Sequence, residues 1–170
     1  MRRVALALLV VGAIGIGVAV FALIDSGSDD ATTSVSNARL HFATRPAVAP
    51  FPGATETHLA LGGRCLRLVI ADDEAERVQG LRRRDSLGAY DGMLFVYAQP
   101  SNATFTMSTV PVPLDIGFYR ASGAPVSRRR MTPCPRVDAE CPAYSADAPF
   151  VYAVETIRGR LPSGALTMCA

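Results

Sequence analysis

The feature that most constrains this chain is an uninterrupted apolar segment near its start, from Val4 to Ile24. It holds thirteen Val, Leu, Ile or Phe residues, five Ala and three Gly, with no charged or hydroxyl side chain. As a helix rising about 1.5 Å per residue it would be about 30 Å long, the thickness of the hydrocarbon core of a bilayer. Residues 1–24 are therefore predicted to form a single transmembrane helix that acts as a signal anchor.

Charges on either side of this segment predict its orientation. Arg2 and Arg3 precede it, whereas Asp25, Asp29 and Asp30 follow it. Because positively charged flanks stay in the cytoplasm, we expect the rest of the chain to lie outside the cytoplasm, with the membrane as one partner. A removable signal peptide has the same basic start, so secretion after cleavage is the alternative, although its apolar region is usually only about 7–15 residues long.

Composition divides the remainder into a linker and one domain. Residues 25–55 are rich in Ser, Thr, Asp, Ala and Pro, which is typical of a flexible linker. Residues 56–170 are enough for one hydrophobic core and too few for two domains. After residue 24 the chain holds fifteen Arg, no Lys and fifteen acidic residues. This balance removes the electrostatic basis for a nucleic-acid partner, and we expect none.

Short apolar segments between turn signals predict an α+β domain that consists mainly of strands. Residues 58–61 and 65–71 flank a Gly-Gly pair and are expected to form a hairpin. The sequence Asp73-x-x-Glu76 is typical of a capping box and predicts one short helix, through about Arg82. Further strands are predicted at 93–98, 103–107, 114–119, 150–155 and 165–169.

Short motifs follow one another between about residues 64 and 156: Glu76-Arg77-Val78-Gln79-Gly80-Leu81, Arg84-Asp85-Ser86-Leu87, Gly92-Met93-Leu94-Phe95-Val96-Tyr97, Phe105-x-Met107, Pro113-Leu114-Asp115-Ile116-Gly117-Phe118, Pro133-Cys134, Cys141-Pro142-x-Tyr144, and a strand leading to Glu155. In order and spacing these motifs resemble a widespread bacterial and archaeal family, the domain of unknown function 192. The resemblance implies a compact, commonly exported domain with a single small barrel-like or strongly curved mixed sheet, and no agreed activity.

The chain departs from the family pattern after Phe105. The family tends to carry Trp-Met-Lys-Asn-Thr there, whereas this chain has Thr106-Met107-Ser108-Thr109-Val110. An activity that relies on the missing Lys and amide is not expected, although the hydroxyls of Ser108 and Thr109 could still bind a ligand. Arg84 or Arg130 could engage an anionic substrate. The candidate binding residues are Arg84, Met107, Thr109, Arg130 and Tyr144.

The four cysteines are expected to form disulfides, because an exported domain meets an oxidising environment. Four cysteines allow three pairings. We favour Cys134 with Cys141, which bracket a Pro-rich loop, and Cys65 with Cys169, which ties the C-terminus to the first strand of the domain. Neither C-x-x-C nor a His-Cys cluster is present, so the sequence disfavours a metal site or thiol redox chemistry.

Asp115 and Glu155 are the candidate catalytic residues, because a partly buried carboxyl group with a raised pKa can act as a general acid or base. The apolar residues of the strand at 114–119 occupy alternate positions, which places Asp115 on the opposite face. A structural role for Asp115 is favoured, either as a hydrogen-bond acceptor or as the partner of Arg84 or Arg130. No serine elbow accompanies these carboxyl groups.

Two functions remain. The leading hypothesis is a membrane-anchored, disulfide-braced module that binds or assembles envelope polymer or protein partners. The alternative is an envelope hydrolase that acts on a glycan or ester, with Asp115 as general acid or base. Neither a Gly-rich phosphate loop nor a dinucleotide motif is present, and we expect no cofactor.

Overall fold

The computed structural model describes residues 39–170. The predicted transmembrane helix and the linker up to residue 38 lie outside the described residues. Between residues 39 and 170, no helix is both long and apolar enough to cross a membrane. This part of the chain is mainly β-structure with one short α-helix, as the sequence predicts.

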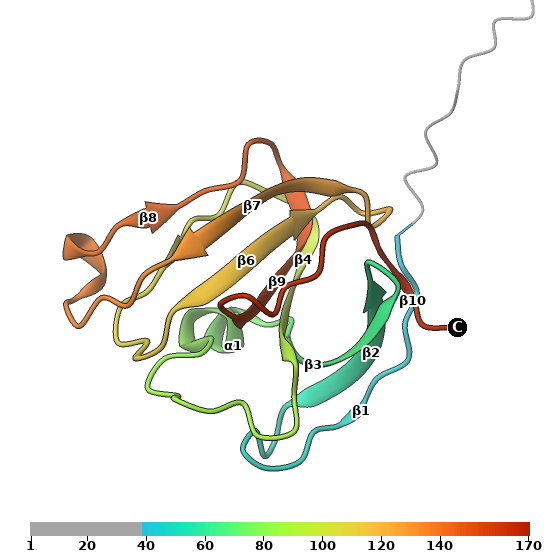
Figure 1. Ribbon diagram of the computed structural model, residues 1–170, viewed down its shortest axis with the longest axis horizontal. Helices are drawn as coiled ribbons and strands as arrows, with labels where there is room; N and C mark the ends of the chain where they lie inside the picture. Colours follow the sequence, from blue (N-terminus) through green and yellow to red (C-terminus); the bar gives the residue numbers. More distant parts are fainter. Residues whose placement is uncertain (1–38) are drawn as a thin grey trace, which may run out of the picture. The chain divides into compact units, whose positions relative to one another are not determined.

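Most strands belong to one curved, mixed sheet (Figure 1). Its order is β1-β2-β3-β4-β9-β6-β7, and β10 pairs with β2 beside β1. Neighbouring strands are antiparallel except β3 and β4, which are parallel. Strands β5 and β8 form a separate two-stranded sheet. The strands are β1 (Arg45–Pro46), β2 (Thr55–Leu61), β3 (Arg64–Ala71), β4 (Gly92–Ser101), β5 (Phe105–Thr106), β6 (Leu114–Tyr119), β7 (Pro125–Met131), β8 (Ala143–Tyr144), β9 (Phe150–Ile157) and β10 (Leu166–Met168).

Helix α1 (Glu74–Gln79) lies on the connection between the parallel strands β3 and β4. The Asp73 carboxylate accepts a hydrogen bond from the Glu76 N–H (2.8 Å), and the Glu76 carboxylate accepts one from the Asp73 N–H, which confirms the capping box. The helix ends at Gln79 rather than near Arg82. Gly80 ends it with a φ of +44°, in the region that favours glycine.

Successive side chains of a strand point to opposite sides of a sheet. In the central strands β6 and β9 the side chains on both sides are buried. On one face Phe95 and Phe118 pack edge-on against Phe105 of β5, with ring centroids 5.0 and 5.6 Å apart. On the other face Leu94 and Val154 pack with apolar residues of β2, β3 and β10. Each face therefore has its own core.

Residues 39–55 belong to the linker predicted from composition, but in the structure this segment packs against the domain. Phe51 is only 4% exposed. The side chain of Glu56 has no exposed surface, and its carboxylate accepts hydrogen bonds from Arg67 (2.7 Å) and from the Tyr90 hydroxyl. Hydrogen bonds from Arg67 and then Tyr90 lower the pKa of Glu56 to about 2. The folded unit thus begins before residue 56.

Both disulfides are the pairs favoured from the sequence. Cys65 of β3 is bonded to Cys169, which directly follows β10. Cys134 is bonded to Cys141, and this bridge closes the loop that contains a short 3₁₀ helix, Asp138–Glu140. The first bridge fixes the C-terminus, and the second fixes a loop that borders the candidate site.

Strand β7 is the longest of the strands that the sequence analysis missed, and the others are the two-residue strands β1 and β8. Its sequence contains three consecutive arginines and so lacks the apolar alternation used to predict the other strands. Among the described strands it lies at the edge of the sheet and pairs only with β6. An edge strand can keep charged side chains in solvent, so its polarity is compatible with pairing.

Candidate functional site

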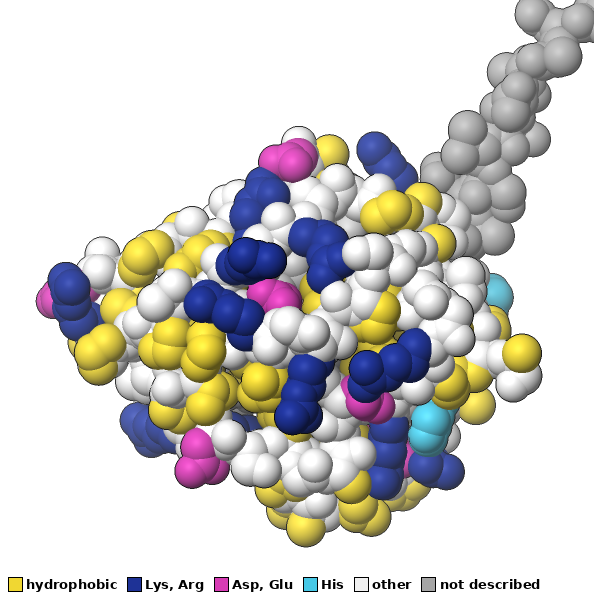
Figure 2. Space-filling view, viewed as in Figure 1, with side chains coloured by type: hydrophobic (Ala, Val, Ile, Leu, Met, Phe, Trp, Pro, Cys, Tyr) yellow, Lys and Arg dark blue, Asp and Glu magenta, His cyan; other side chains and the backbone are white. Residues whose placement is uncertain are grey.

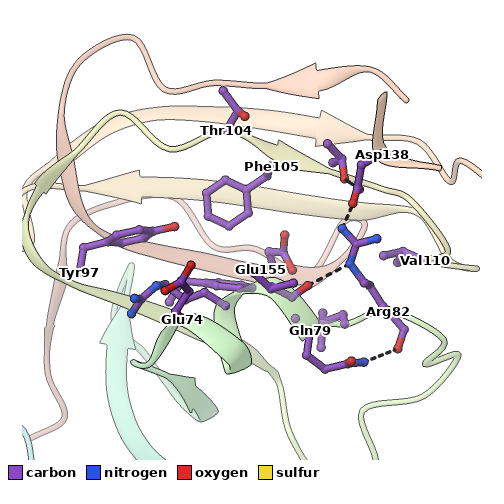
Figure 3. A pocket seen from close by; sticks show the side chains of 15 residues that line it. Glu74, Gln79, Arg82, Tyr97, Thr104, Phe105, Val110, Asp138 and Glu155 are labelled. Carbon is purple, nitrogen blue, oxygen red and sulfur yellow. Dashed lines mark hydrogen bonds and ion pairs between the residues drawn. The ribbon is translucent and has the colours of Figure 1, made fainter. Parts of the chain in front are cut away.

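A pocket of about 360 Å³ opens on the side of the sheet where α1 lies. Helix α1 and the turn after it form one wall, and β4, β5 and the loop around Asp138 form the others (Figure 3). Glu155 of β9 lies at its floor. The volume is within the range of small-molecule sites.

Glu155 is the unusual group in this pocket. It is 4% exposed, and no hydrogen bond from a described residue contributes to its pKa. The residues that flank it across the strands, Met93 of β4 and Ile116 of β6, are apolar. Burial away from water disfavours the charged form and raises the pKa of Glu155 to about 8. The group is therefore mainly protonated at neutral pH and presents one donor and one acceptor.

Aromatic rings line the pocket above this carboxyl group. Phe95 and Phe105 are buried core residues, and Tyr97 lies further along β4. The guanidinium group of Arg77 lies 5.0 Å from the centre of the Tyr97 ring and donates a hydrogen bond to the Val96 carbonyl (3.0 Å). Burial raises the pKa of Tyr97. The pocket thus has an aromatic wall beside a neutral hydrogen-bonding floor.

Arg82 and Asp138 close one side of the pocket (Figure 3). An ion pair of 2.6 Å joins them, and Asp138 also accepts a hydrogen bond from the Thr106 hydroxyl (2.6 Å). Hydrogen bonds from Thr106 and then Arg82 lower the pKa of Asp138. Arg82 further donates to the Ser108 carbonyl (3.1 Å). Hydrogen bonds and an ion pair thus hold the charged side chains of this wall in place. They join the turn after α1, strand β5 and the loop closed by the disulfide.

Asp115 and Glu155 do not form a pair. Strands β6 and β9 are antiparallel with Asp115 opposite Thr156 and Ile116 opposite Glu155, so the two carboxyl groups lie on opposite faces of the sheet. One oxygen of Asp115 accepts a hydrogen bond from the Gly159 N–H (2.6 Å). This is the structural type of contact that the sequence analysis favoured for Asp115, and a two-carboxylate glycosidase site is not assembled.

The other predicted binding residues are spread over the domain. Arg84 donates to the Pro50 carbonyl (2.8 Å) and lies over the Phe51 ring at 4.2 Å. Met107 is fully buried in the core, and the Thr109 N–H is bonded to the Cys134 carbonyl (2.9 Å). These contacts support the fold.

Tyr144 and Arg130 lie apart from that group. The Tyr144 hydroxyl accepts a hydrogen bond from the Thr132 N–H (3.1 Å). Arg130 is opposite Asp115 on β7, without an ion pair between them. Of the predicted site residues only Glu155 lines the pocket beside α1.

Arg82, Tyr97, Thr106 and Asp138 are pocket residues that the sequence analysis did not select. Arg82 belongs to a run of three arginines, a pattern more typical of a solvated surface. The signal in the sequence that could have located this pocket was Glu155, because every residue before it in β9 is apolar. In residues 39–170 no three His, Cys, Asp or Glu side chains gather where they could hold a metal ion.

Comparisons with known proteins agree with this fold. A crystal structure of a protein of unknown function from Novosphingobium aromaticivorans DSM 12444 is 26% identical, with a TM-score of 0.60, over 73% of this chain and 93% of that one. A protein from Sinorhizobium meliloti 1021, described as a candidate transcription regulator, is 19% identical, with a TM-score of 0.55, over 76% of this chain and 95% of that one. The second likeness shows the fold alone. No protein of curated function matches this sequence.

The family model of DUF192, described as an uncharacterized ACR, matches residues 57–166. These residues include α1, the pocket beside it and strand β9 with Glu155. The match extends the resemblance noted in the sequence from about residues 64–156 to most of the described domain. The chain belongs to the DUF192 family.

Proposed function

We propose that this chain is a membrane-anchored binding module of the cell envelope, and that its ligand enters the pocket beside α1. The apolar segment 4–24 supports the anchor, with secretion after cleavage as the alternative. The two disulfides support an oxidising compartment. The envelope polymer or protein that the sequence analysis expects as a partner is then within reach of the tethered domain.

The observation that carries this proposal is the Glu155 carboxyl group. Burial of a carboxyl group away from water destabilises a fold, and carboxyl groups with strongly raised pKa values concentrate at functional sites. Because its pKa is about 8, Glu155 presents a neutral carboxyl group at pH 7. One donor and one acceptor side by side complement an amide, and the aromatic walls fit the apolar part of such a ligand. Amide-bearing envelope polymer is therefore the proposed ligand class.

Binding of small amide probes tests the pocket. N-acetylglucosamine and N-acetylalaninamide are titrated into the chain, and the backbone amide signals of α1 and β9 are followed by NMR. Wild type is expected to bind at pH 7 and to lose affinity above pH 8, because Glu155 ionises. Glu155→Gln keeps a neutral donor and acceptor, so it should bind without this pH dependence, whereas Glu155→Met should not bind.

Glu74→Gln is the matched control, because Glu74 lines the rim of the same pocket but is exposed. It should bind as wild type does. Equal binding by wild type and Glu155→Met would contradict the proposal.

The anchor has its own test. Protease treatment of spheroplasts should remove the domain of residues 39–170 from the outside of the membrane. Intact-mass analysis with and without reductant should show two disulfides and reveal any N-terminal cleavage. A cytosolic domain with four free thiols would contradict the envelope assignment.

A second function follows from the same pKa. A carboxyl group that titrates near pH 8 is suited to general acid catalysis at neutral pH, which favours Glu155 over Asp115 as the acid of an envelope hydrolase. Glutamine at position 155 separates the two functions, since it can form hydrogen bonds but cannot transfer a proton. Retained binding with abolished turnover of a glycan or ester would identify the enzyme, and unchanged turnover would exclude Glu155 as its acid.

A further inference from the structure

A second pocket, of about 470 Å³, lies on the opposite face of the sheet. Asp115 of β6 and the three arginines of β7 line one side, and the loop between β9 and β10 lines the other. The lining residues are Asp115, Arg128, Arg129, Arg130, Gly159, Leu161 and Ser163. Arginine side chains gather over β6 and β7 on this face (Figure 2). The proposed function does not use this pocket.

Asp115 brings an unsatisfied acceptor to the pocket. The residue is 7% exposed, and its Oδ2 accepts the Gly159 N–H. Its Oδ1 is buried and has no hydrogen-bond partner among residues 39–170. Buried polar atoms are nearly always paired, so this oxygen is poised for a donor that the described chain does not supply.

The arginines of the pocket have different roles. Arg128 donates hydrogen bonds to the Ser163 hydroxyl (2.7 Å) and to the Leu161 carbonyl, which holds the loop over the pocket. Arg129 forms an ion pair with Asp147. Arg130 is exposed, and no described residue accepts a hydrogen bond from its guanidinium group or pairs with it.

The sheet register places Arg130, which has no ion-pair partner among residues 39–170, beside the unpaired Oδ1 of Asp115. Arg130 of β7 is directly opposite Asp115 of β6, so their side chains emerge on the same face. They lie within one pocket but form no ion pair with each other. A ligand that satisfies both groups must carry an anion for Arg130 and, close to it, a hydrogen-bond donor for Asp115.

From this juxtaposition we infer that the pocket binds a uronate, a sugar that carries a carboxylate and neighbouring hydroxyl groups. The planar guanidinium group of Arg130 matches the carboxylate in geometry and charge. A sugar hydroxyl donates to the free oxygen of Asp115. The Asp115 charge repels anions that bring no donor, so the pair selects a hydroxylated acid over a simple anion. Uronate residues of an anionic envelope glycan have this chemistry.

Three ligands test which chemical groups the pocket recognises. Glucuronate carries both groups, acetate has the carboxylate without the hydroxyls, and glucose has the hydroxyls without the carboxylate. Each is titrated into the full-length, oxidised chain in non-ionic detergent at low salt, with NMR detection at the amides of Asp115 and Gly159. Saturable binding of glucuronate, at least about tenfold tighter than that of acetate or glucose, is expected. Equal affinities for glucuronate and acetate would overturn the inference.

Two variants test the named residues. Arg130→Gln should weaken glucuronate binding about tenfold or more, the loss expected for one charge-assisted hydrogen bond. Asp115→Asn keeps an oxygen for the Gly159 N–H but removes both the free acceptor and the charge that repels anions, so acetate should bind more tightly and the preference for glucuronate over acetate should fall. An unchanged ratio of the glucuronate and acetate affinities in Asp115→Asn would refute the role of the free oxygen.

Arg120→Gln is the charge-matched control, because Arg120 is exposed on the turn after β6 and outside this pocket. It should bind glucuronate as wild type does, and an equal loss in Arg120→Gln and Arg130→Gln would reduce the effect to net charge. Arg130 is exposed, so its variant should fold even if Asp115→Asn does not. Glu155→Met should leave glucuronate binding intact, which separates this inference from the proposed function.

Discussion

Replacing Glu155 by glutamine should change how the stability of the protein depends on pH. In the folded chain the pKa of Glu155 is about 8, against an ordinary value of 4.5. The folded state therefore holds the proton more tightly than the unfolded state does. Because the unfolded state binds fewer protons between these two pKa values, the free energy of unfolding must fall as the pH rises through this window.

The magnitude follows from the two pKa values. Within the window each pH unit removes about 1.4 kcal/mol from the free energy of unfolding. Between pH 5 and pH 7 wild type should lose about 3 kcal/mol relative to Glu155→Gln, which has no titrating group at this position. Below pH 4.5 Glu155 is protonated in both states, and above pH 8 it is ionised in both. The difference between the proteins should be flat in those two ranges.

Urea unfolding of the oxidised chain at pH 5, 6 and 7 measures this difference. Glu74→Gln serves as the control, because it removes an exposed carboxyl group from the rim of the same pocket and should follow wild type. A difference between wild type and Glu155→Gln that stays constant within about 0.5 kcal/mol from pH 5 to pH 7 would refute the reasoning. It would mean that the carboxyl group is ionised in the folded protein and has a partner there.

Three further perturbations probe the frame around the sites. Glu56, whose pKa is lowered to about 2, should stabilise the fold above pH 4.5 and lose this effect as the pH falls toward 2; an acid titration of the melting temperature that is identical in Glu56→Gln would contradict this. Replacing Cys65 and Cys169 by alanine opens a bridge between residues 104 apart in sequence and should lower the free energy of unfolding by about 4–5 kcal/mol in urea, and a negligible loss would argue against the pairing. At Gly92 an alanine Cβ would lie 2.2 Å from the Glu155 carbonyl oxygen, so Gly92→Ala should destabilise by about 1–3 kcal/mol; wild-type stability in the same assay would disprove this close contact.

Local sequence signals were sufficient for several elements. The Gly-Gly pair predicts the hairpin of β2 and β3, and Asp73 with Glu76 predicts the start of α1, because both depend on residues close together in the chain. The disulfide pairs also agree with the sequence interpretation. Strand β7 was missed because its pairing with β6, rather than an apolar pattern of its own, makes it a strand.

The candidate sites divide in the same way. Alternation within one strand was enough to place Asp115 on the face opposite Leu114 and Ile116, and the register of β6 agrees. The sequence also marks Glu155 as a charge in an apolar strand. It does not contain the strand order, which inserts β9 between β4 and β6, nor the register that sends Glu155 and Asp115 to different pockets. Those features depend on hydrogen bonds between strands distant in sequence, and a shift of one residue in that pairing would exchange the two faces.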